Sequence, residues 1–373
     1  MIRERTKKFW QEIDKSDKKP SAFLVINPKN IFYLTKFTGE GILLLTPEQK
    51  CLITDSRYTE QAKQETSDCQ IIIQNMNHSD AQTESLCKLI SELKIKELGF
   101  ESDMLTFDLY HKYQDYFPLI KLYPFKNIIE KIRMVKDYKE IDILKKSAKI
   151  ATKSFLQTIV SIQSDISETS IASLLNCNMR KNGAKKEAFD LIVTSGERGT
   201  LIHGEPSSKK IKDEELIIID FGAVYEMYYS DCTRSFVLDK ATYDQKKIFD
   251  IIKKTQTETL QQVRPGIRCC DLDKYARNII EDSGYGEYFN HSLGHGVGLD
   301  IHEFPRLSFT DETVLQPGMV VTIEPGIYVP KVGGVRIEDT VVITEKGCEI
   351  ITVLPKELLI SSYHEDNCND VII

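Results

Sequence analysis

Residues 215–238 read ELIIIDFGAVYEMYYSDCTRSFVL, a segment in which aspartates stand in two otherwise apolar runs. Short runs rich in Ile, Val, Phe and Tyr predict strands. Only a short connection around residues 224–226 separates the two runs, so we expect them to pair as an antiparallel hairpin. The pairing would bring Asp220 and Asp231 together, although they are eleven positions apart in the chain.

Two further acidic residues interrupt apolar runs later in the chain. Glu324 ends the run VVTIE at 320–324, and Glu338 lies within VRIEDTVVI at 335–343. Burying a carboxylate costs several kcal/mol unless a positive group compensates its charge. Arg336 shares a strand face with Glu338 and is expected to orient neighbouring carboxylates. A metal ion would compensate the remaining charge.

Four of the seven histidines, His203, His291, His295 and His302, fall within 100 positions of one another. His295 lies in LGHGVG at 293–298, where the glycines disfavour a helix and permit close backbone approach. With His295, the four acids offer four carboxylates and one imidazole. Bridging carboxylates can hold two divalent ions roughly 3.5 to 4 Å apart, and oxygen-rich ligation favours Mn²⁺ over a thiolate-type zinc site. These residues predict a dinuclear hydrolase site; the competing interpretation is a set of salt-bridged strand residues.

The length of 373 residues suggests two domains. The first part alternates strands, expected at 23–26, 42–45, 51–53 and 71–73, with helices, expected at 82–93 and 105–116. This alternation predicts an α/β domain. The pattern stops in a charged stretch near residue 130, so we expect domains at 1–130 and 131–373.

The second domain is expected to be α+β, because its helices are segregated from long hairpins. Helix pairs at 139–160 with 168–181, and at 243–263 with 271–282, each precede strands, which are expected at 189–194, 215–223, 227–238, 319–323 and 335–343. The repeated order indicates a faint internal duplication, with turns at 163–165 and 264–266 in corresponding places. The polar tail 361–373 is expected to be frayed.

The composition is that of an ordinary soluble globular protein, with 41% hydrophobic and 28% charged residues. A formal charge of −7 opposes binding to nucleic acid. No run approaches the ~20 apolar residues of a membrane-spanning helix, and we see no secretory or lipid signal. Nine cysteines without a Cys-x-x-Cys motif fit reduced thiols. We therefore expect a cytoplasmic protein without a nucleic-acid or membrane partner.

Five motifs together resemble the pita-bread metallopeptidases, specifically the proline-directed branch that contains aminopeptidase P and prolidase. They are DFG at 220–222, YSDCTRSF at 229–236, HSLGHGVGLDIHE at 291–303, TIEPGIY at 322–328 and GVRIED at 334–339. The similarity extends through 189–196 and 203–207, and TDSRYTEQ at 54–61 is similar to the creatinase-type amino-terminal domain. The resemblance implies an α/β creatinase-like domain followed by an α+β pita-bread catalytic domain.

The resemblance also implies a role for each candidate residue. Asp220, Asp231, His295, Glu324 and Glu338 would bind two divalent ions, with Mn²⁺ expected and Co²⁺ or Zn²⁺ possible, and Glu324 would in addition accept the proton of the attacking water. His203 and His302 would contact the scissile peptide and its tetrahedral intermediate, and His291 would lie near the proline. Arg336 and Phe189 complete the predicted substrate-binding set, with core packing as the alternative for Phe189.

The implied reaction is hydrolysis of the X-Pro bond in short peptides with proline at the second position, by an enzyme that forms a homodimer through its first domain. A segment around Tyr58 would help to close the cleft; a plain surface turn is the alternative. Our main interpretation is an Xaa-Pro aminopeptidase, and the alternative is an Xaa-Pro dipeptidase (prolidase). The complete ligand set disfavours a non-catalytic pita-bread binding module and the metal-free creatinase. The amino-terminal domain and His291 disfavour a methionyl aminopeptidase.

Overall fold

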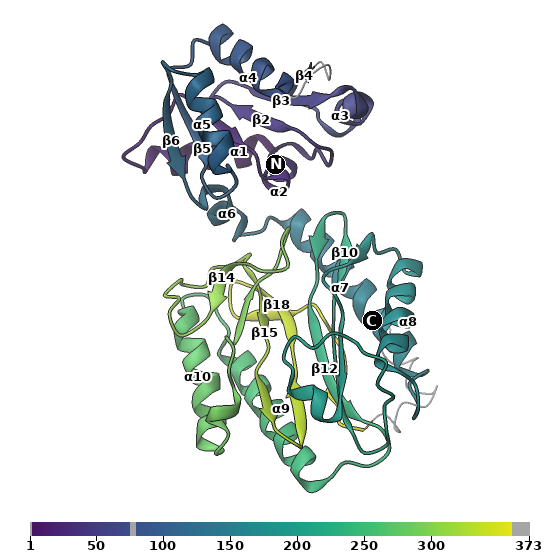
Figure 1. Cartoon of the computed structure of the whole chain (residues 1–373). Helices are drawn as coiled ribbons and strands as arrows, with labels where there is room; N and C mark the ends of the chain where they lie inside the picture. Colours follow the sequence, from purple (N-terminus) through teal and green to yellow (C-terminus); the bar gives the residue numbers. More distant parts are fainter. Residues whose placement is uncertain (1, 75–79, 360–373) are drawn as a thin grey trace. The chain divides into compact units, whose positions relative to one another are not determined.

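The computed structural model describes residues 2–74 and 80–359 (Figure 1). The chain divides into two compact units, Met1–Arg133 and Met134–Ile373. Within the described ranges, we find no helix that is both long and apolar enough to cross a membrane. The predicted fraying of the tail 361–373 concerns residues outside these ranges.

The first unit is an α/β domain around one mixed six-stranded sheet of order β4-β3-β2-β1-β5-β6. β1 pairs antiparallel with β2 and β2 with β3, and the other neighbours are parallel. Its strands are β1 (Ala22–Val25), β2 (Ile42–Leu45), β3 (Lys50–Asp55), β4 (Gln70–Gln74), β5 (Glu97–Glu101) and β6 (Lys121–Phe125). Its α-helices are α1 (Ile2–Asp14), α2 (Pro28–Thr35), α3 (Thr59–Glu65), α4 (Ala81–Glu92), α5 (Phe107–Tyr116) and α6 (Ile128–Arg133).

The four strands and two helices predicted for this unit are confirmed, with small shifts of their ends. The sequence pattern did not predict α1, α2, α3, α6, β5 or β6. In α1 only Arg5, Phe9 and Ile13 are buried, so its apolar stripe is too narrow to stand out from the charged residues around it. The strand β5, with the sequence ELGFE, is short and contains a glycine, which weakens the strand signal.

The second unit is α+β. Its helices are α7 (Tyr138–Ile159), α8 (Glu168–Lys181), α9 (Tyr243–Gln262) and α10 (Cys269–Asp282). Its early strands are β7 (Lys186–Glu187), β8 (Ile192–Ser195), β9 (Leu216–Phe221), β10 (Ala223–Tyr225), β11 (Tyr228–Tyr229) and β12 (Cys232–Val237). The later strands are β13 (Gly294–Gly296), β14 (Glu303–Leu307), β15 (Val320–Ile323), β16 (Gly326–Val329), β17 (Gly333–Arg336), β18 (Asp339–Ile343) and β19 (Cys348–Ile350).

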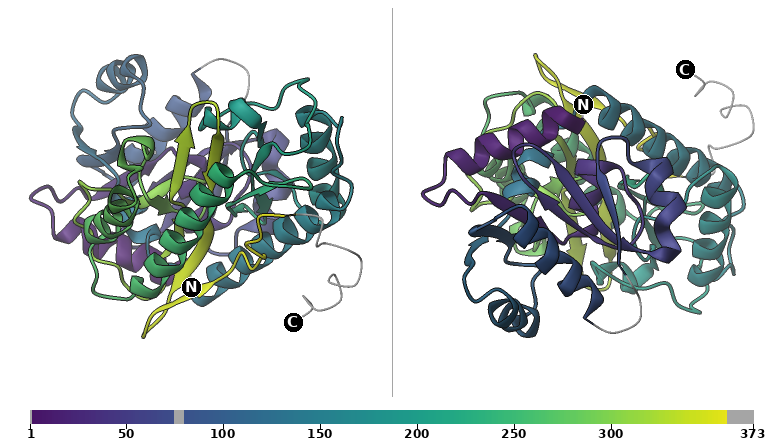
Figure 2. Two further views of the ribbon diagram at one scale, coloured as in Figure 1. Left: turned by 90° about the horizontal axis from the view of Figure 1, so that it is seen from below. Right: turned by 90° about the horizontal axis from the view of Figure 1, so that it is seen from above.

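Each helix pair of this unit covers its own set of strands. The side-by-side helices α7 and α8, visible in teal in both views of Figure 2, share a core with the antiparallel sheet β12-β9-β8 through Phe155, Leu175, Val193 and Ile217. The helix α10 packs on the five-stranded sheet β14-β13-β15-β18-β19, and α9 packs near the hairpin β16-β17. Apolar side chains of both helix pairs therefore support the strands that carry the predicted site residues.

The two helix-pair turns share a backbone pairing that fits the predicted internal duplication. Asp165 and Gly266 both adopt positive φ, 69° and 90°. The Asp165 N–H donates to the carbonyl of Ile211, and the Gly266 N–H donates to the carbonyl of Leu315, both at 2.9 Å. The two halves thus connect each helix pair to the following strands in the same way.

The prediction of one continuous strand over 335–343 is wrong. Arg336 ends β17, which pairs with β16, whereas Asp339 begins β18, which pairs with β15. The two residues between them pass from one sheet to the other, and the Glu338 N–H donates to the Thr233 carbonyl at 3.1 Å. Glu338 therefore lies at a junction between two sheets and not within a strand. Strand alternation does not determine which way its side chain points.

The predicted run 215–223 is also interrupted, at Gly222. A β-carbon at Gly222 would lie 1.8 Å from the Ser230 carbonyl oxygen, so only glycine lets the two sides of the hairpin approach. We expect Gly222→Ala to destabilise the second unit by about 1 to 3 kcal/mol, because this contact is to backbone and cannot move aside. Calorimetry should show a lower unfolding midpoint.

The matched control for this prediction is Gly347→Ala. Its β-carbon would meet nothing closer than 3.9 Å, so the unfolding midpoint should stay at the wild-type value. Equal midpoints for the two variants would contradict the close approach at Gly222.

Candidate metal centre

The structure gathers the predicted site residues around one cavity of about 650 Å³ in the second unit. The candidate ligands reach it from β9, the residue before β12, β13, the residue after β15 and the junction of β17 with β18. All ten predicted residues line the cavity: Phe189, His203, Asp220, Asp231, His291, His295, His302, Glu324, Arg336 and Glu338. Their placement together agrees with the expectation of a single site.

The expected hairpin brings the two aspartates to this cavity. In the antiparallel pair of β9 and β12, Asp220 lies opposite Thr233, which follows Asp231 by two residues. The Arg336 guanidinium donates from Nη2 to Oδ2 of Asp220 at 2.7 Å. Arg336 therefore orients Asp220, as the sequence predicts.

His295 presents an unprotonated nitrogen to two carboxylates. Its Nδ1 lies 3.1 Å from the Gly296 carbonyl oxygen, which can only accept, so this nitrogen carries the proton. Burial lowers the pKa of His295 to about 3, which leaves Nε2 with a lone pair at neutral pH. That nitrogen lies 3.5 Å from Oδ2 of Asp231 and 3.3 Å from Oε1 of Glu324. A lone pair that faces carboxylate oxygens is repulsive unless a cation or a proton lies between them.

The acidic oxygens are also left without donors. Ligand atoms of Asp231, His295 and Glu338 all lie within 4.8 Å of one another. Within the described part of the chain, Asp220 Oδ1, Asp231 Oδ1 and Glu338 Oε1 are buried and accept no hydrogen bond. An unsatisfied buried polar atom costs about 1 to 3 kcal/mol, and more if it is charged. Three buried oxygens without donors, two of them on carboxylates that lie beside the His295 imidazole, fit the coordination of divalent ions.

The carboxylates resist ionisation in the absence of a cation. Burial, followed by the charges of neighbouring carboxylates, raises the pKa of Asp231 and of Glu338 well above their usual range. Burial likewise raises the pKa of Glu324 to about 8, against the opposing effect of Arg336. Divalent cations would favour the ionised forms of all three. The residues present thus fit a divalent metal centre with mainly oxygen ligands.

The other predicted histidines surround the candidate ligands. His291 is neutral at physiological pH, because burial and then the charge of Arg336 lower its pKa to about 3. The His302 ring packs edge-on against the His295 ring, with 4.3 Å between centroids. His203 and His302 are exposed and Phe189 is half-buried, so all three are open to a molecule in the cavity.

Tyr328 had no predicted role, and it does not line the cavity, but it contacts two residues that do. The Tyr328 hydroxyl accepts a hydrogen bond from Arg336 Nη1 at 2.7 Å and lies 3.0 Å from Nε2 of His291. Burial raises the pKa of Tyr328 to about 12. Two nearby glycines are the sequence feature that pointed to a closely packed side chain here. A β-carbon at Gly326 or Gly334 would lie within 3 Å of the Tyr328 side chain.

Two protein-family models match the chain, one over the first unit and one over the second. The Creatinase/Prolidase N-terminal domain matches residues 5–135, and Metallopeptidase family M24 matches residues 142–345.

Relatives of known identity match over nearly the whole chain. The Xaa-Pro dipeptidase of Pyrococcus horikoshii is 39% identical over 361 residues, which are 96% of this chain and 99% of the relative. The solved structure of an Xaa-Pro dipeptidase from Bacillus anthracis has a TM-score of 0.91 at 38% identity and covers 96% of this chain and 99% of its own. That of an X-Pro aminopeptidase from Thermotoga maritima has a TM-score of 0.86 at 38% identity, with 91% and 97% covered.

These matches agree with the predicted fold class, an α/β creatinase-type domain followed by an α+β pita-bread domain, and with the prediction of a metallopeptidase. The chain belongs to metallopeptidase family M24 and carries the creatinase/prolidase amino-terminal domain.

Proposed function

We propose that this metallopeptidase is an Xaa-Pro dipeptidase, which hydrolyses dipeptides with proline at the second position. This replaces the Xaa-Pro aminopeptidase as the main interpretation. The names of the relatives from Pyrococcus and Bacillus favour the dipeptidase, although the similar structure from Thermotoga is named an aminopeptidase.

The observation that carries this choice is an unpaired guanidinium at the cavity. Arg306 lines the cavity, and its charge lowers the pKa of His302, although less than burial does. Among the described residues, no carboxylate pairs with the Arg306 side chain. Arg336, the other arginine of the cavity, is already engaged by Asp220 and Tyr328. Arg306 is therefore the guanidinium that remains available for a ligand.

A dipeptide offers the group that such a guanidinium binds. The proline of an Xaa-Pro dipeptide ends in a free carboxylate, whereas in a longer peptide the same carbon forms an amide. Arginine binds carboxylates with charge-assisted, often bidentate hydrogen bonds. Pairing with Arg306 would thus favour substrates that end at the proline.

The site residues support peptide hydrolysis by a water molecule. Two divalent ions held by Asp220, Asp231, His295, Glu324 and Glu338 would lower the pKa of a bound water toward neutrality and polarise the scissile carbonyl. Glu324 would accept the proton of that water at Oε1, which the Thr322 hydroxyl holds at 3.2 Å. It would then pass the proton to the proline nitrogen, which must be protonated to leave.

The surrounding side chains would bind the substrate and stabilise the charge that develops. His302 and His203 are exposed to the cavity and can donate hydrogen bonds to the scissile peptide and its oxyanion. Neutral His291 and half-buried Phe189 offer weakly polar surfaces to the proline ring.

Three finer assignments are part of the proposal. The oxygen-rich ligand set favours Mn²⁺, with Co²⁺ or Zn²⁺ as alternatives. The family resemblance supports a homodimer, which we place in the cytoplasm. It also supports a role at the cleft for the segment around Tyr58, a half-buried residue that packs edge-on against Phe37.

Replacement of Arg306 tests the proposed recognition of the carboxylate. We expect Arg306→Gln to raise the KM for an Xaa-Pro dipeptide, because a charge-assisted hydrogen bond worth about 1.5 to 3 kcal/mol, roughly 10- to 150-fold in binding, is lost. The KM for the corresponding Xaa-Pro amide, which has no carboxylate, should stay near the wild-type value. Steady-state kinetics with the two substrates measures the difference.

The control is Arg264→Gln, which removes an exposed arginine that does not line the cavity. It should change neither KM. If Arg306→Gln affected dipeptide and amide equally, the proposed pairing with the carboxylate would be wrong.

A further inference from the structure

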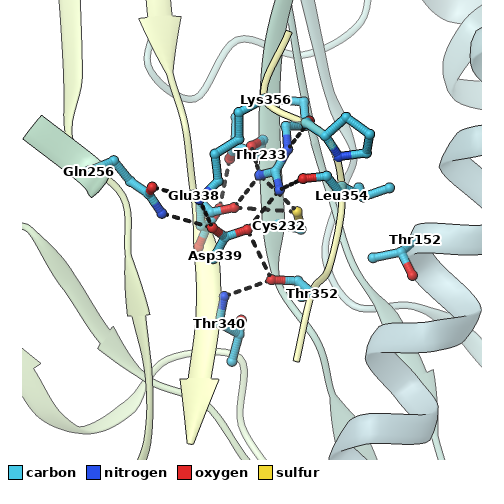
Figure 3. Close-up of polar contacts among 12 residues, drawn as sticks. Thr152, Cys232, Thr233, Gln256, Glu338, Asp339, Thr340, Thr352, Leu354 and Lys356 are labelled. Carbon is cyan, nitrogen blue, oxygen red and sulfur yellow. Dashed lines mark hydrogen bonds and ion pairs between the residues drawn. The ribbon is translucent and has the colours of Figure 1, made fainter. Parts of the chain in front are cut away.

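A buried ion pair lies directly behind the candidate ligand Glu338. Arg234 Nη2 and Asp339 Oδ1 are 2.7 Å apart, and their side chains are only 4% and 1% exposed. Asp339 also accepts hydrogen bonds at its other oxygen from Lys356 at 2.6 Å and from Gln256 at 2.9 Å, as drawn in Figure 3. Neither Arg234 nor Asp339 lines the cavity.

Stability alone does not explain this pair. Removing two charges from water costs several kcal/mol per ion, and well-packed apolar residues often stabilise a protein as much as a buried ion pair or more. The pair instead fixes the orientation of the groups around it, because a planar guanidinium holds several hydrogen-bond acceptors in one plane.

The Arg234 guanidinium joins three backbone segments. Nη1 donates to the carbonyls of Glu338 at 2.6 Å and Thr233 at 2.9 Å. Nη2 and Nε donate to the carbonyls of Leu354 and Pro355, both at 3.0 Å. Asp339 holds the guanidinium in the orientation that makes these contacts, so β12, the junction before β18 and the segment 354–355 are tied to one side chain.

Glu338 is the residue that these contacts fix. It lies outside both β17 and β18, so no strand ladder holds its peptide groups. Its N–H donates to the Thr233 carbonyl at 3.1 Å, its carbonyl accepts from Arg234, and its Oε2 accepts from the Thr233 hydroxyl at 2.7 Å. The one oxygen left over is Oε1, the buried atom that accepts no hydrogen bond from the described residues.

We propose that Arg234 and Asp339 are positioning residues of the metal centre, which hold Glu338 so that its Oε1 faces Asp231 and His295 before any metal binds. The inference rests on the proposed metal centre and adds to it a pair of residues that touch neither metal nor substrate. It predicts that loss of the pair weakens metal binding even where the fold is intact.

The test is a titration of metal-free protein with Mn²⁺, in which isothermal titration calorimetry measures the binding affinity. Arg234→Lys keeps the charge but cannot reach all four carbonyls, and we expect at least one Mn²⁺ to bind about 10- to 100-fold more weakly, the range seen when groups that orient ligands are removed. The double variant Arg234→Met with Asp339→Leu replaces the ion pair with apolar side chains. Its metal-free form should still be folded at the temperature of the titration, yet show the same loss of Mn²⁺ affinity.

The matched control replaces a partly buried ion pair of the first unit, Lys50 with Asp68, whose charged atoms are 2.6 Å apart and whose side chains are 6% and 18% exposed. Lys50→Met with Asp68→Leu should leave Mn²⁺ binding unchanged. Wild-type protein that binds no Mn²⁺ would refute the proposed metal centre itself. Wild-type affinity in the double variant would overturn only the positioning inference. Weak Mn²⁺ binding in a double variant that is unfolded at the temperature of the titration, together with wild-type affinity in a folded Arg234→Lys protein, would assign the pair to folding and would also overturn the inference.

Discussion

Glu324→Gln is expected to lower kcat for an Xaa-Pro dipeptide by about 10²- to 10⁴-fold, the usual contribution of a positioned acid or base. The amide has the size of the carboxylate but cannot accept a proton at this position. An amide is also a weaker metal ligand than a carboxylate. In the native protein, Oε1 of Glu324 lies 3.3 Å from Nε2 of the candidate ligand His295. Steady-state kinetics at saturating Mn²⁺, with metal content determined on the same sample, measures the effect.

The control for Glu324→Gln is Glu345→Gln, an exposed glutamate in the turn after β18 that does not line the cavity. It should retain wild-type kcat. A Glu324→Gln protein with full metal occupancy and near-normal turnover would contradict the role of Glu324 as proton acceptor.

Removal of metal is expected to abolish hydrolysis, and Mn²⁺ should restore it. The nucleophile of the proposed reaction is a water whose pKa only the metal ions would lower toward neutrality, so it is lost with them. Elemental analysis before and after chelation should account for the loss. Undiminished turnover in verified metal-free protein would refute the metallopeptidase mechanism.

The stability of the metal-free chain should also depend on pH in a defined direction. Because burial raises the pKa of Glu324 to about 8 from an ordinary 4.5, the folded state binds a proton more tightly than the unfolded state. The resulting stabilisation is fully present below pH 4.5 and is lost as pH rises through 8. Above about pH 7 the lowered pKa values of His291 and His295 no longer affect the balance, because both histidines are then neutral in the folded and in the unfolded state. Between pH 7 and 8 the unfolding temperature of metal-free protein should therefore fall by more than that of the Mn²⁺-bound protein.

The sequence predicted much of the scaffold because the elements that build it carry periodic signals. The strand β2 and the helix α8 agree residue for residue with the prediction, one as a continuous apolar run and the other as an amphipathic pattern. The candidate ligands stood out for a related reason. Asp220 and Glu338 interrupt or end runs that are otherwise buried, and a charge in such a place requires a compensating group.

The rest depends on contacts between residues far apart in the chain. The contact from Arg234 to the Glu338 carbonyl spans 104 positions, and no local pattern marks either residue as its partner. The break between β17 and β18 arises because the chain changes sheets, although its apolar alternation continues. Likewise, nothing in the sequence indicated that the Arg306 side chain lies at the cavity, and the aminopeptidase was therefore preferred to the dipeptidase.

The central claim, that the enzyme favours substrates ending at proline, is tested most directly by the kcat/KM values for matched Xaa-Pro, Xaa-Pro-Yaa and Xaa-Ala-Yaa peptides with Mn²⁺. We predict that Xaa-Pro exceeds Xaa-Pro-Yaa by about tenfold or more, the least expected from a charge-assisted hydrogen bond to the proline carboxylate. Xaa-Ala-Yaa should be cleaved slowest. A higher kcat/KM for Xaa-Pro-Yaa than for Xaa-Pro would contradict the assignment as a dipeptidase and would favour the aminopeptidase instead.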